Sequence, residues 1–596
     1  MAVNFRSHSL TKKEKAMFKI LFTAVLMAWG ISAFAQPRSE HEVLDIAQKF
    51  WNVRQSNVRI SIAPISVNSL QNKTRRVNSV SGCYVINDET NKRFVIISAD
   101  ERMPQILGYS DNGIFSAESA PEGLLDMIAE YNAQYDFLLS NNLEKYQNPQ
   151  RVSDVNYPIM IQTKWGQKEP YWNECPLDAN GQRCVTGCVA TAMAQVVNYH
   201  RWPEKGQGGI VSYDVRPYIT SIAQSFDFDD LSIDWNNMLD TYDSGATQTQ
   251  KDEVAKLMHA CGVSVYMDYT SGVSGADDPN IPYALINNFG YNPNIYYAAK
   301  AYYEIDEWHQ LIEEELQAGR PILYSGEGIG GHQFVLDGKK DGLYHFNFGW
   351  EGDDDGYFLL DAINLGLHNY NSSQAMILGV CPTITGIHKN VFYTDEFKLD
   401  TIANLGEKVK IKTFKPYCFS NEANTVAGKA RFKGEYGIGL FDKDFNIIKS
   451  LYKYKGSFIA RSSQTSYSGD GNYIHFDNET FINGKQYYIA PYAKGENSSV
   501  PTLMRTLNGF EDWYRVSVND SKVVLERKKV ITDNPAIMGD SNGDGVVDVA
   551  DIVNIVNYIM NRNTESFIFI NSDIDKDGVI DVADITLIIG IIMKSE

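Results

Sequence analysis

A cysteine, a histidine and an asparagine in the middle of the chain have the side-chain types and the order of a thiol-based catalytic site. Cys188 follows Gly187 and opens a run whose apolar residues recur at helical spacing up to Pro203, so we expect it in the first turn of a mostly buried helix. At that position the helix dipole and the unpaired amides favour the thiolate, which is the nucleophilic form. The alternative interpretation of Cys188 alone is a buried structural cysteine.

His332 is the candidate general base for this nucleophile. It stands at the start of a β run, directly after glycines that let a substrate backbone approach closely. Asn347 lies on the next β run, beyond a turn at 339–342, and on an adjacent antiparallel strand it would hold the imidazole in its working tautomer. His332 lies 144 residues after Cys188, which fits the papain-like interval of about 130–150 residues. His345 is a rival base, because strand alternation places it on the same face as Asn347.

Acyl transfer through a cysteine also requires hydrogen-bond donors for the tetrahedral oxyanion. Gln167 lies 21 residues before Cys188, and its amide together with the backbone N–H of Cys188 would supply two donors. The alternative interpretation of Gln167 is an ordinary surface amide. The ordered set indicates acyl-transfer chemistry more strongly than any of its members does alone.

Residues 155–385, which contain this set, resemble the streptopain family of bacterial cysteine peptidases, whose fold is papain-like. The segments that carry the resemblance follow the family's order: 164–167, 186–192, 261–265 with 267–269, 330–332 and 347–350. The resemblance implies that Cys188 is the nucleophile and His332 the base. It also implies that Gln167 is the oxyanion donor and that Asn347 helps to orient His332.

The resemblance implies a substrate cleft as well, with a preference for a hydrophobic residue two positions before the cut. One position departs from the family pattern, which commonly has Trp directly after the Asn, whereas this chain has Phe348. A phenylalanine still shields the site from water but offers less area, so we expect activity to survive. The residues expected to line the cleft are Ser274, Gly275, Gly331 and Trp350.

The family is made as a zymogen, and residues 36–150 resemble its inhibitory propeptide. They read as a separate small α+β unit, with a β run at 94–98 and helical periodicity over 124–139. By resemblance this segment would block the cleft and displace His332 until the polar stretch 141–154 is cut. The alternative is a permanent extra domain.

Taken with this resemblance, and with the resemblance of the C-terminal repeat to a dockerin, the elements around the catalytic set imply an α+β fold class: a papain-like cysteine peptidase domain with an N-terminal propeptide domain, a β-sandwich domain and a small α-helical calcium-binding dockerin-like module. The sandwich is expected from short alternating runs separated by turn residues. The predicted boundaries are 1–35 for a signal peptide, 36–150 for the propeptide, 151–385 for the peptidase domain, 386–532 for the sandwich and 536–596 for the module.

The last sixty or so residues contain an internal repeat of period 33, in which each copy resembles a calcium loop followed by an apolar helix. The loops end on Asp, and no good helix precedes the first, which makes them similar to a dockerin, a module that binds cohesin domains. The alternative is a calcium-stiffened stability module with no partner. The expected calcium ligands are Asp540, Asn542, Asp544, Val546, Asp548, Asp551, Asp573, Asp575, Asp577, Val579, Asp581 and Asp584.

Charge and targeting signals narrow the classes of function. The net charge of −20 argues against nucleic-acid or anionic-membrane partners, because both require a basic surface. A basic stretch, a short apolar run and a small-residue cleavage site at 33–35 predict secretion, with no membrane span after signal removal. A short membrane anchor is the alternative, and retention at the cell surface stays open.

Seven cysteines do not form a disulfide scaffold in a chain of this length. We expect four of them to be buried hydrophobes, namely Cys83, Cys261, Cys381 and Cys418. Cys175 and Cys184 could bridge each other.

The sequence thus predicts a secreted cysteine endopeptidase acting on proteins or peptides. The competing predictions are a Cys–His amidase or acyltransferase, and a non-catalytic adhesin or scaffold subunit that carries a dead peptidase fold.

Overall fold

The structure is a computed structural model, and no helix among the residues it describes is long and apolar enough to span a membrane. The expected signal peptide and the polar stretch 141–154 lie outside these residues. The structure describes residues 37–52, 59–63, 82–140, 155–215, 222–303, 305–326, 331–360, 374–385, 392–400, 402–418, 431–442, 446–459, 473–477, 480–495, 501–506, 513–519, 521–528, 539, 541, 547, 549–560, 572, 574 and 582–595.

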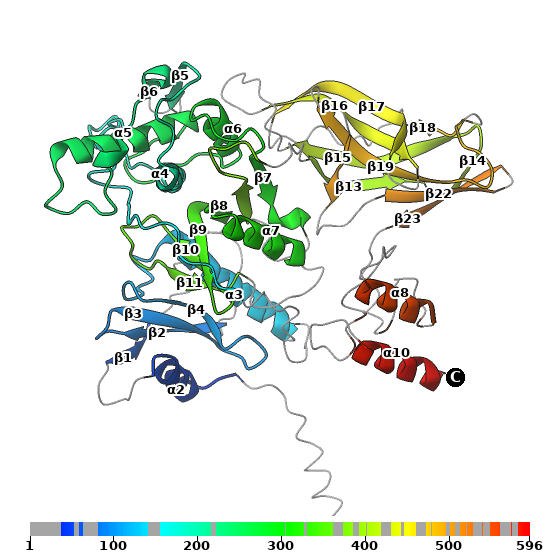
Figure 1. The fold of residues 1–596 in the computed structure, drawn as a ribbon, viewed down its shortest axis with the longest axis horizontal. Coiled ribbons are helices and arrows are strands. Elements are labelled where there is room, and N and C mark those ends of the chain that lie inside the picture. Colours follow the sequence, from blue (N-terminus) through cyan, green and yellow to red (C-terminus); the bar gives the residue numbers. More distant parts are fainter. Residues whose placement is uncertain are drawn as a thin grey trace, which may run out of the picture.

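A ten-stranded antiparallel sheet organises the part of the chain that contains the catalytic set (Figure 1). Its central strands are almost wholly buried, as expected for a sheet covered on both faces. In spatial order the strands are β1 (Ile60–Ile62), β2 (Cys83–Asp88), β3 (Arg93–Ser98), β4 (Ile106–Ser110), β11 (Gly356–Phe358), β10 (Leu343–Asn347), β9 (His332–Lys340), β8 (Ile322–Gly326), β12 (Ala375–Leu378) and β7 (Tyr296–Ala299).

The prediction that 36–150 forms a separate α+β unit is wrong for its strands, which continue the sheet of the peptidase region. Strand β4 pairs with β11, with Gly108 opposite Phe358. The pairing requires a glycine, because a Cβ at Gly108 would lie 2.3 Å from the Phe358 ring. Without β4, strand β11 would leave unpaired backbone N–H and C=O groups at the edge of the peptidase sheet. Such an edge readily accepts a further strand, which is the physical reason for the pairing.

Helices cover this sheet and extend beyond one end of it. Figure 1 shows α4, α5 and α6 gathered with the β5–β6 hairpin at that end, while α2 lies beside β2 and β3. Helix α4 contacts both α5 and β9, so it connects the helical layer to the sheet. The bounds are α2 (Glu40–Phe50), α3 (Glu122–Ser140), α4 (Cys188–His200), β5 (Ile210–Val215), β6 (Ile222–Asp227), α5 (Gln248–Ser264), α6 (Asn280–Asn287) and α7 (Ile305–Gln317), with short 3-10 turns at Phe228–Asp230, Trp235–Asn237 and Lys300–Tyr302.

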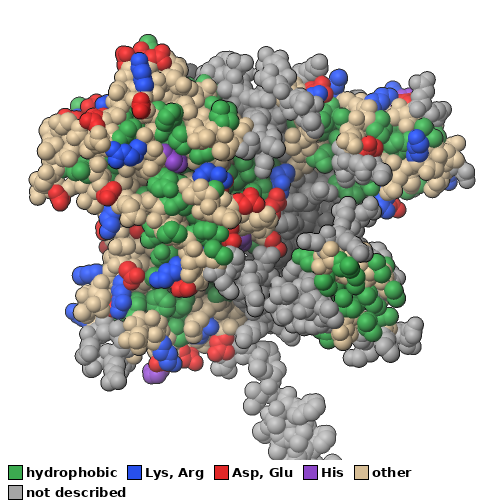
Figure 2. Space-filling model, in the orientation of Figure 1, with side chains coloured by type: hydrophobic (Ala, Val, Ile, Leu, Met, Phe, Trp, Pro, Cys, Tyr) green, Lys and Arg blue, Asp and Glu red, His purple; other side chains and the backbone are tan. Residues whose placement is uncertain are grey.

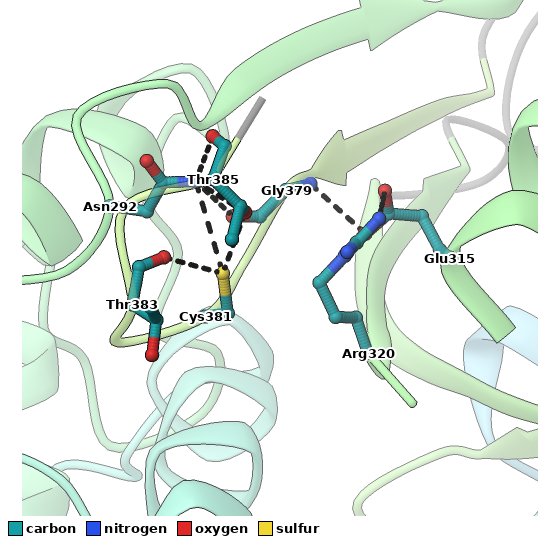
Figure 3. Close-up of polar contacts among 7 residues, drawn as sticks. All are labelled: Asn292, Glu315, Arg320, Gly379, Cys381, Thr383 and Thr385. Atoms are coloured by element: carbon teal, nitrogen blue, oxygen red, sulfur yellow. Dashed lines mark hydrogen bonds and ion pairs between the residues drawn. The ribbon is translucent and has the colours of Figure 1, made fainter. Parts of the chain in front are cut away.

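The chain leaves the peptidase sheet after β12 through a segment tied by polar contacts (Figure 3). The Asn292 amide donates to the carbonyls of Gly379 and Thr385, and the Gly379 N–H donates to Glu315, which is also paired with Arg320. Cys381 lies in this segment and is only partly buried, 3.1 Å from the Thr383 carbonyl, so the expectation of a buried hydrophobe is wrong there. Cys83 and Cys261 are buried as expected.

Two further sheets follow and share one hydrophobic core, which includes Phe397, Ile438 and Tyr514. Almost all of their strand pairs are antiparallel, which fits the alternating runs of the sequence. One sheet has the order β18 (Tyr473–His475), β15 (Lys408–Cys418), β13 (Phe392–Leu399) and β21 (Arg505–Thr506). The other has the order β14 (Ile402–Asn404), β23 (Lys522–Lys528), β22 (Trp513–Asn519), β19 (Gln486–Gly495), β16 (Arg431–Phe441) and β17 (Ile447–Ile459), with β20 (Thr502–Leu503) beside β19.

In the C-terminal module, the described residues include two long helices, α8 (Val549–Ile559) and α10 (Val582–Ser595). They pack through Ile555 and Ile588, which are fully buried and stand one repeat of 33 residues apart. Asp551 and Asp584, also one repeat apart, are both fully buried. The other ten expected calcium ligands lie outside the described residues.

Candidate active site

Cys188 is the first residue of α4, as the sequence predicts. Gly187 turns the chain into the helix with φ of +86°, and a Cβ there would lie 2.8 Å from the Ser274 carbonyl. Glycine is therefore required at this position by both conformation and space. The Cys188 side chain is 9% exposed and borders a cleft of about 950 Å³. Cys188 thus lies at the N-terminal, positive end of the α4 dipole.

His332 is the first residue of β9 and borders the same cleft. Burial lowers the pKa of His332, but hydrogen-bond and charge contacts with Cys188 and Glu122 outweigh burial and raise it to about 10. The imidazole is therefore protonated at neutral pH in this conformation. A protonated imidazole can stabilise a thiolate or give up a proton, but it cannot accept one.

Glu122 is a site residue that the sequence analysis missed. It opens α3 in the N-terminal region, lines the cleft, and is ion-paired through Oε2 with Nε2 of His332. Contact with His332 lowers the pKa of Glu122. The sequence showed only an acidic residue after Pro121, which is typical of any helix start, so no local signal distinguished it.

The cleft contains every residue that the resemblance assigned to substrate binding. Trp350 is 39% exposed there, so its ring is available to a ligand. Gln167 also borders the cleft, and its carbonyl accepts a hydrogen bond from the Thr186 N–H, which fixes it near the start of α4. The predicted residues in the lining are Gln167, Cys188, Ser274, Gly275, Gly331, His332 and Trp350.

Asn347 does not contact His332 in this structure, contrary to expectation. The β9–β10 hairpin forms as predicted, but its register places Asn347 opposite Val335, three residues from His332. The Asn347 amide is hydrogen bonded instead to the Thr163 carbonyl, to the Gly349 N–H and to the side chain of Gln195.

Gln195 was not singled out from the sequence, although it is fully buried on α4 and joins Asn347 to Thr163. The available signal was a polar side chain seven residues after Cys188, on the same helix face. Through Gly349, this buried network fixes the turn that leads to Trp350.

His345, the rival candidate for the base, has its partner outside the cleft. His345 is buried, and its Nδ1 lies 2.6 Å from the Asp337 carboxylate. Among the described residues that line the cleft, His332 is the only histidine and Cys188 the only cysteine.

Other thiols near the site lack the features of a nucleophile. Burial raises the pKa of Cys175 to about 12 and that of Cys184 to about 11, and both are unbridged. A buried thiol with a raised pKa is protonated at neutral pH and therefore inert.

Phe348 is buried away from the cleft in a cluster with Phe334, Phe346 and Phe358. A Cβ on Gly123 of α3 would lie 3.2 Å from its ring. In this conformation the side chain belongs to the core between sheet and α3, so the replacement of Trp by Phe alters packing rather than the cleft surface.

Three segments of the chain match known families. Residues 165–358 match the Peptidase C10 family, residues 35–135 match the Spi protease inhibitor, and residues 538–593 match the dockerin type I domain.

Individual relatives are cysteine proteases. The chain is 32% identical to streptopain of Streptococcus pyogenes over 399 residues, covering 60% of this chain and 97% of streptopain. It is 27% identical over 389 residues to the thiol protease/hemagglutinin PrtT of Porphyromonas gingivalis, covering 61% of this chain and 44% of PrtT. A solved prointerpain A fragment of Prevotella intermedia matches with 29% identity and a TM-score of 0.45, over 53% of this chain and all of the fragment.

Proposed function

Because the chain belongs to the peptidase C10 family, the streptopain family, we propose that it is the secreted zymogen of a cysteine endopeptidase. The observation that carries this proposal is the meeting of Cys188 and His332 at one cleft. Each is the first residue of its element, and no other cysteine or histidine among the described residues lines that cleft.

In the proposed reaction, the Cys188 thiolate attacks the carbonyl carbon of the scissile peptide bond. The C–N bond then breaks, and the His332 imidazolium gives its proton to the leaving amine, so that an acyl-enzyme thioester remains. Water attacks the thioester and His332 accepts a proton from this water. The C–S bond then breaks, which regenerates the Cys188 thiolate and releases the carboxylic acid product. This cycle needs the imidazole to alternate between charged and neutral forms, which the ion pair with Glu122 opposes.

Gln167 and the Cys188 N–H are the proposed oxyanion donors. Their support is the position of Gln167 on the cleft wall beside the start of α4. Donors aimed at the developing oxyanion typically contribute about 10²–10³ in kcat. Substrate would lie along Ser274, Gly275, Gly331 and Trp350.

We propose two roles for Asn347. Its hydrogen bonds to Gly349 and Gln195 position the turn before Trp350. We further propose that His332 turns toward Asn347 once Glu122 has left the cleft, so that the amide then orients the imidazole.

The N-terminal region is the proposed inhibitor of the unprocessed chain. Helix α3 places Glu122 in the cleft, and the match of residues 35–135 to a protease inhibitor agrees with this role. Cleavage within 141–154 would separate α3 from the peptidase region, although strand β4 must also leave β11.

The C-terminal module is proposed to bind calcium and a cohesin-bearing partner. Asp551 and Asp584 support calcium, because fully buried carboxylates at equivalent repeat positions are typical of cation ligands. Figure 2 shows hydrophobic side chains gathered on this module. Val549 and Val553 of α8 and Leu587 of α10 are exposed. An exposed apolar face of this kind fits a protein partner, and such a partner would retain the secreted enzyme at a surface.

Casein cleavage tests the peptidase proposal. Matured wild-type protein should release acid-soluble peptides, whereas Cys188→Ala and His332→Ala, matured with added protease, should not. Circular dichroism and thermal melting serve as folding controls. Equal casein cleavage by wild type and Cys188→Ala would refute the proposal.

A further inference from the structure

Gln333 is a buried amide in the cleft with no partner. Its side chain is 3% exposed and lines the cleft directly after His332, yet neither Nε2 nor Oε1 is hydrogen bonded to any described residue. An unsatisfied buried polar group costs about 1–3 kcal/mol, and native proteins contain few of them. Because the Gln333 amide lies in a cleft, a ligand bound there would supply the missing hydrogen bonds.

The neighbours of Gln333 are polar as well. Ser325 lies directly opposite Gln333 on the adjacent antiparallel strand β8, so the two side chains share one face of the sheet. The Ser325 hydroxyl donates to Oδ2 of Asp278 at 2.6 Å, and all three residues line the cleft. The wall beside the catalytic pair therefore presents an amide, a hydroxyl and a carboxylate at adjoining positions.

The rest of the cleft strengthens the negative field around this group. Among the lining residues the structure describes, Lys168 is the only lysine or arginine. The carboxylates in the lining, besides Asp278 and Glu122, are Asp214, Asp268, Asp277, Glu351 and Asp353. Walls of one charge sign concentrate substrates of the opposite sign.

We infer that Gln333, Ser325 and Asp278 form a specificity subsite that takes a lysine or arginine side chain of the substrate. An ammonium or guanidinium group donates to both Oε1 of Gln333 and the Asp278 carboxylate. An aliphatic side chain would leave the Gln333 amide unsatisfied and would exclude water from Asp278. The inference rests on the proposed peptidase function.

Paired peptide substrates test this subsite. Matured enzyme is assayed on fluorogenic peptides that carry lysine or norleucine at each of the three positions before the cut, since norleucine keeps the lysine stem without its charge. At one position kcat/KM should favour lysine by about tenfold. Asp278→Asn should reduce this ratio severalfold, and Gln333→Met, which keeps the volume, should shift it toward norleucine. Glu314→Gln, the same charge change on the exposed side of α7, should leave the ratio unchanged.

The outcomes separate the two claims. Norleucine preferred at all three positions, or an unchanged ratio in both subsite variants, would overturn the subsite. Sequencing the casein products supplies a second readout, with lysine and arginine expected to be enriched at one position before the cuts and an even distribution counting against the subsite. Wild-type enzyme that cleaves neither casein nor any peptide would instead overturn the peptidase function itself, and the subsite with it.

Discussion

The ion pair between Glu122 and His332 contributes to the free energy with which the N-terminal region binds the cleft. Glu122→Gln keeps the size of the side chain and removes its charge. The rise in the pKa of His332 from 6.5 to about 10 corresponds to about 5 kcal/mol in favour of the protonated imidazole, shared between Cys188 and Glu122. Because the Glu122 side chain is 45% exposed, solvent screening reduces its share to about 1–2 kcal/mol.

A loss of about 1–2 kcal/mol should lower the equilibrium constant for binding of α3 to the cleft by a factor of about 5–30. The assay is the half-time of maturation of purified unprocessed chain at pH 6, followed by gel electrophoresis. Glu122→Gln should mature faster by up to that factor, while Glu118→Gln, an exposed carboxylate just before α3, should match the wild type. Equal half-times for Glu122→Gln and wild type would refute the reasoning.

The pH dependence of the pair gives a second check on the same variant. The pKa of Glu122 is lowered by His332, so the stabilisation is present above pH 4.5 and is lost as the pH falls below that value. The pKa of His332 is raised, so the stabilisation is full below pH 6.5 and is lost as the pH rises toward about 10. The difference in maturation rate between variant and wild type should therefore be greatest between about pH 4.5 and 6.5.

Three other predictions follow from the fold. Phe348→Ala should destabilise the unprocessed chain by about 3–5 kcal/mol in urea unfolding, because it empties part of a buried aromatic cluster, and a loss below about 1 kcal/mol would contradict that placement. Burial and neighbouring carboxylates raise the pKa of Asp354 to about 7, so thermal stability should fall as the pH rises from about 4 to 7, and Asp354→Asn should flatten this slope. Millimolar calcium should raise the melting temperature of the wild type more than that of Asp584→Asn, which alters one of the two loops, and no response in the wild type would exclude the calcium proposal.

Patterns among residues near in sequence were sufficient to predict the elements that carry Cys188 and His332. The glycine before Cys188 and the apolar spacing after it predicted the start of α4, and the turn at 339–342 predicted the β9–β10 hairpin. Both depend on contacts between residues that are near in sequence.

Contacts between residues far apart in the sequence could not be predicted from these local signals. Nothing in 106–110 indicates that β4 pairs with a strand about 250 residues later, and the presence of Glu122 in the cleft depends on that pairing and on the packing of α3. The register that separates Asn347 from His332 contains a shift between His345 and Phe346, which strict alternation could not predict. The unpartnered state of Gln333 likewise depends on what surrounds it rather than on its neighbours in sequence.

The mass of the mature protein tests the central claim most directly. Unprocessed wild-type chain and Cys188→Ala are purified in parallel, incubated under identical conditions and measured by intact-mass spectrometry. The account predicts that the wild type converts to a species whose N-terminus lies within 141–154, whereas Cys188→Ala keeps its full mass. Processing of Cys188→Ala at the same site and rate would contradict it, and so would a wild type that remains whole under all conditions.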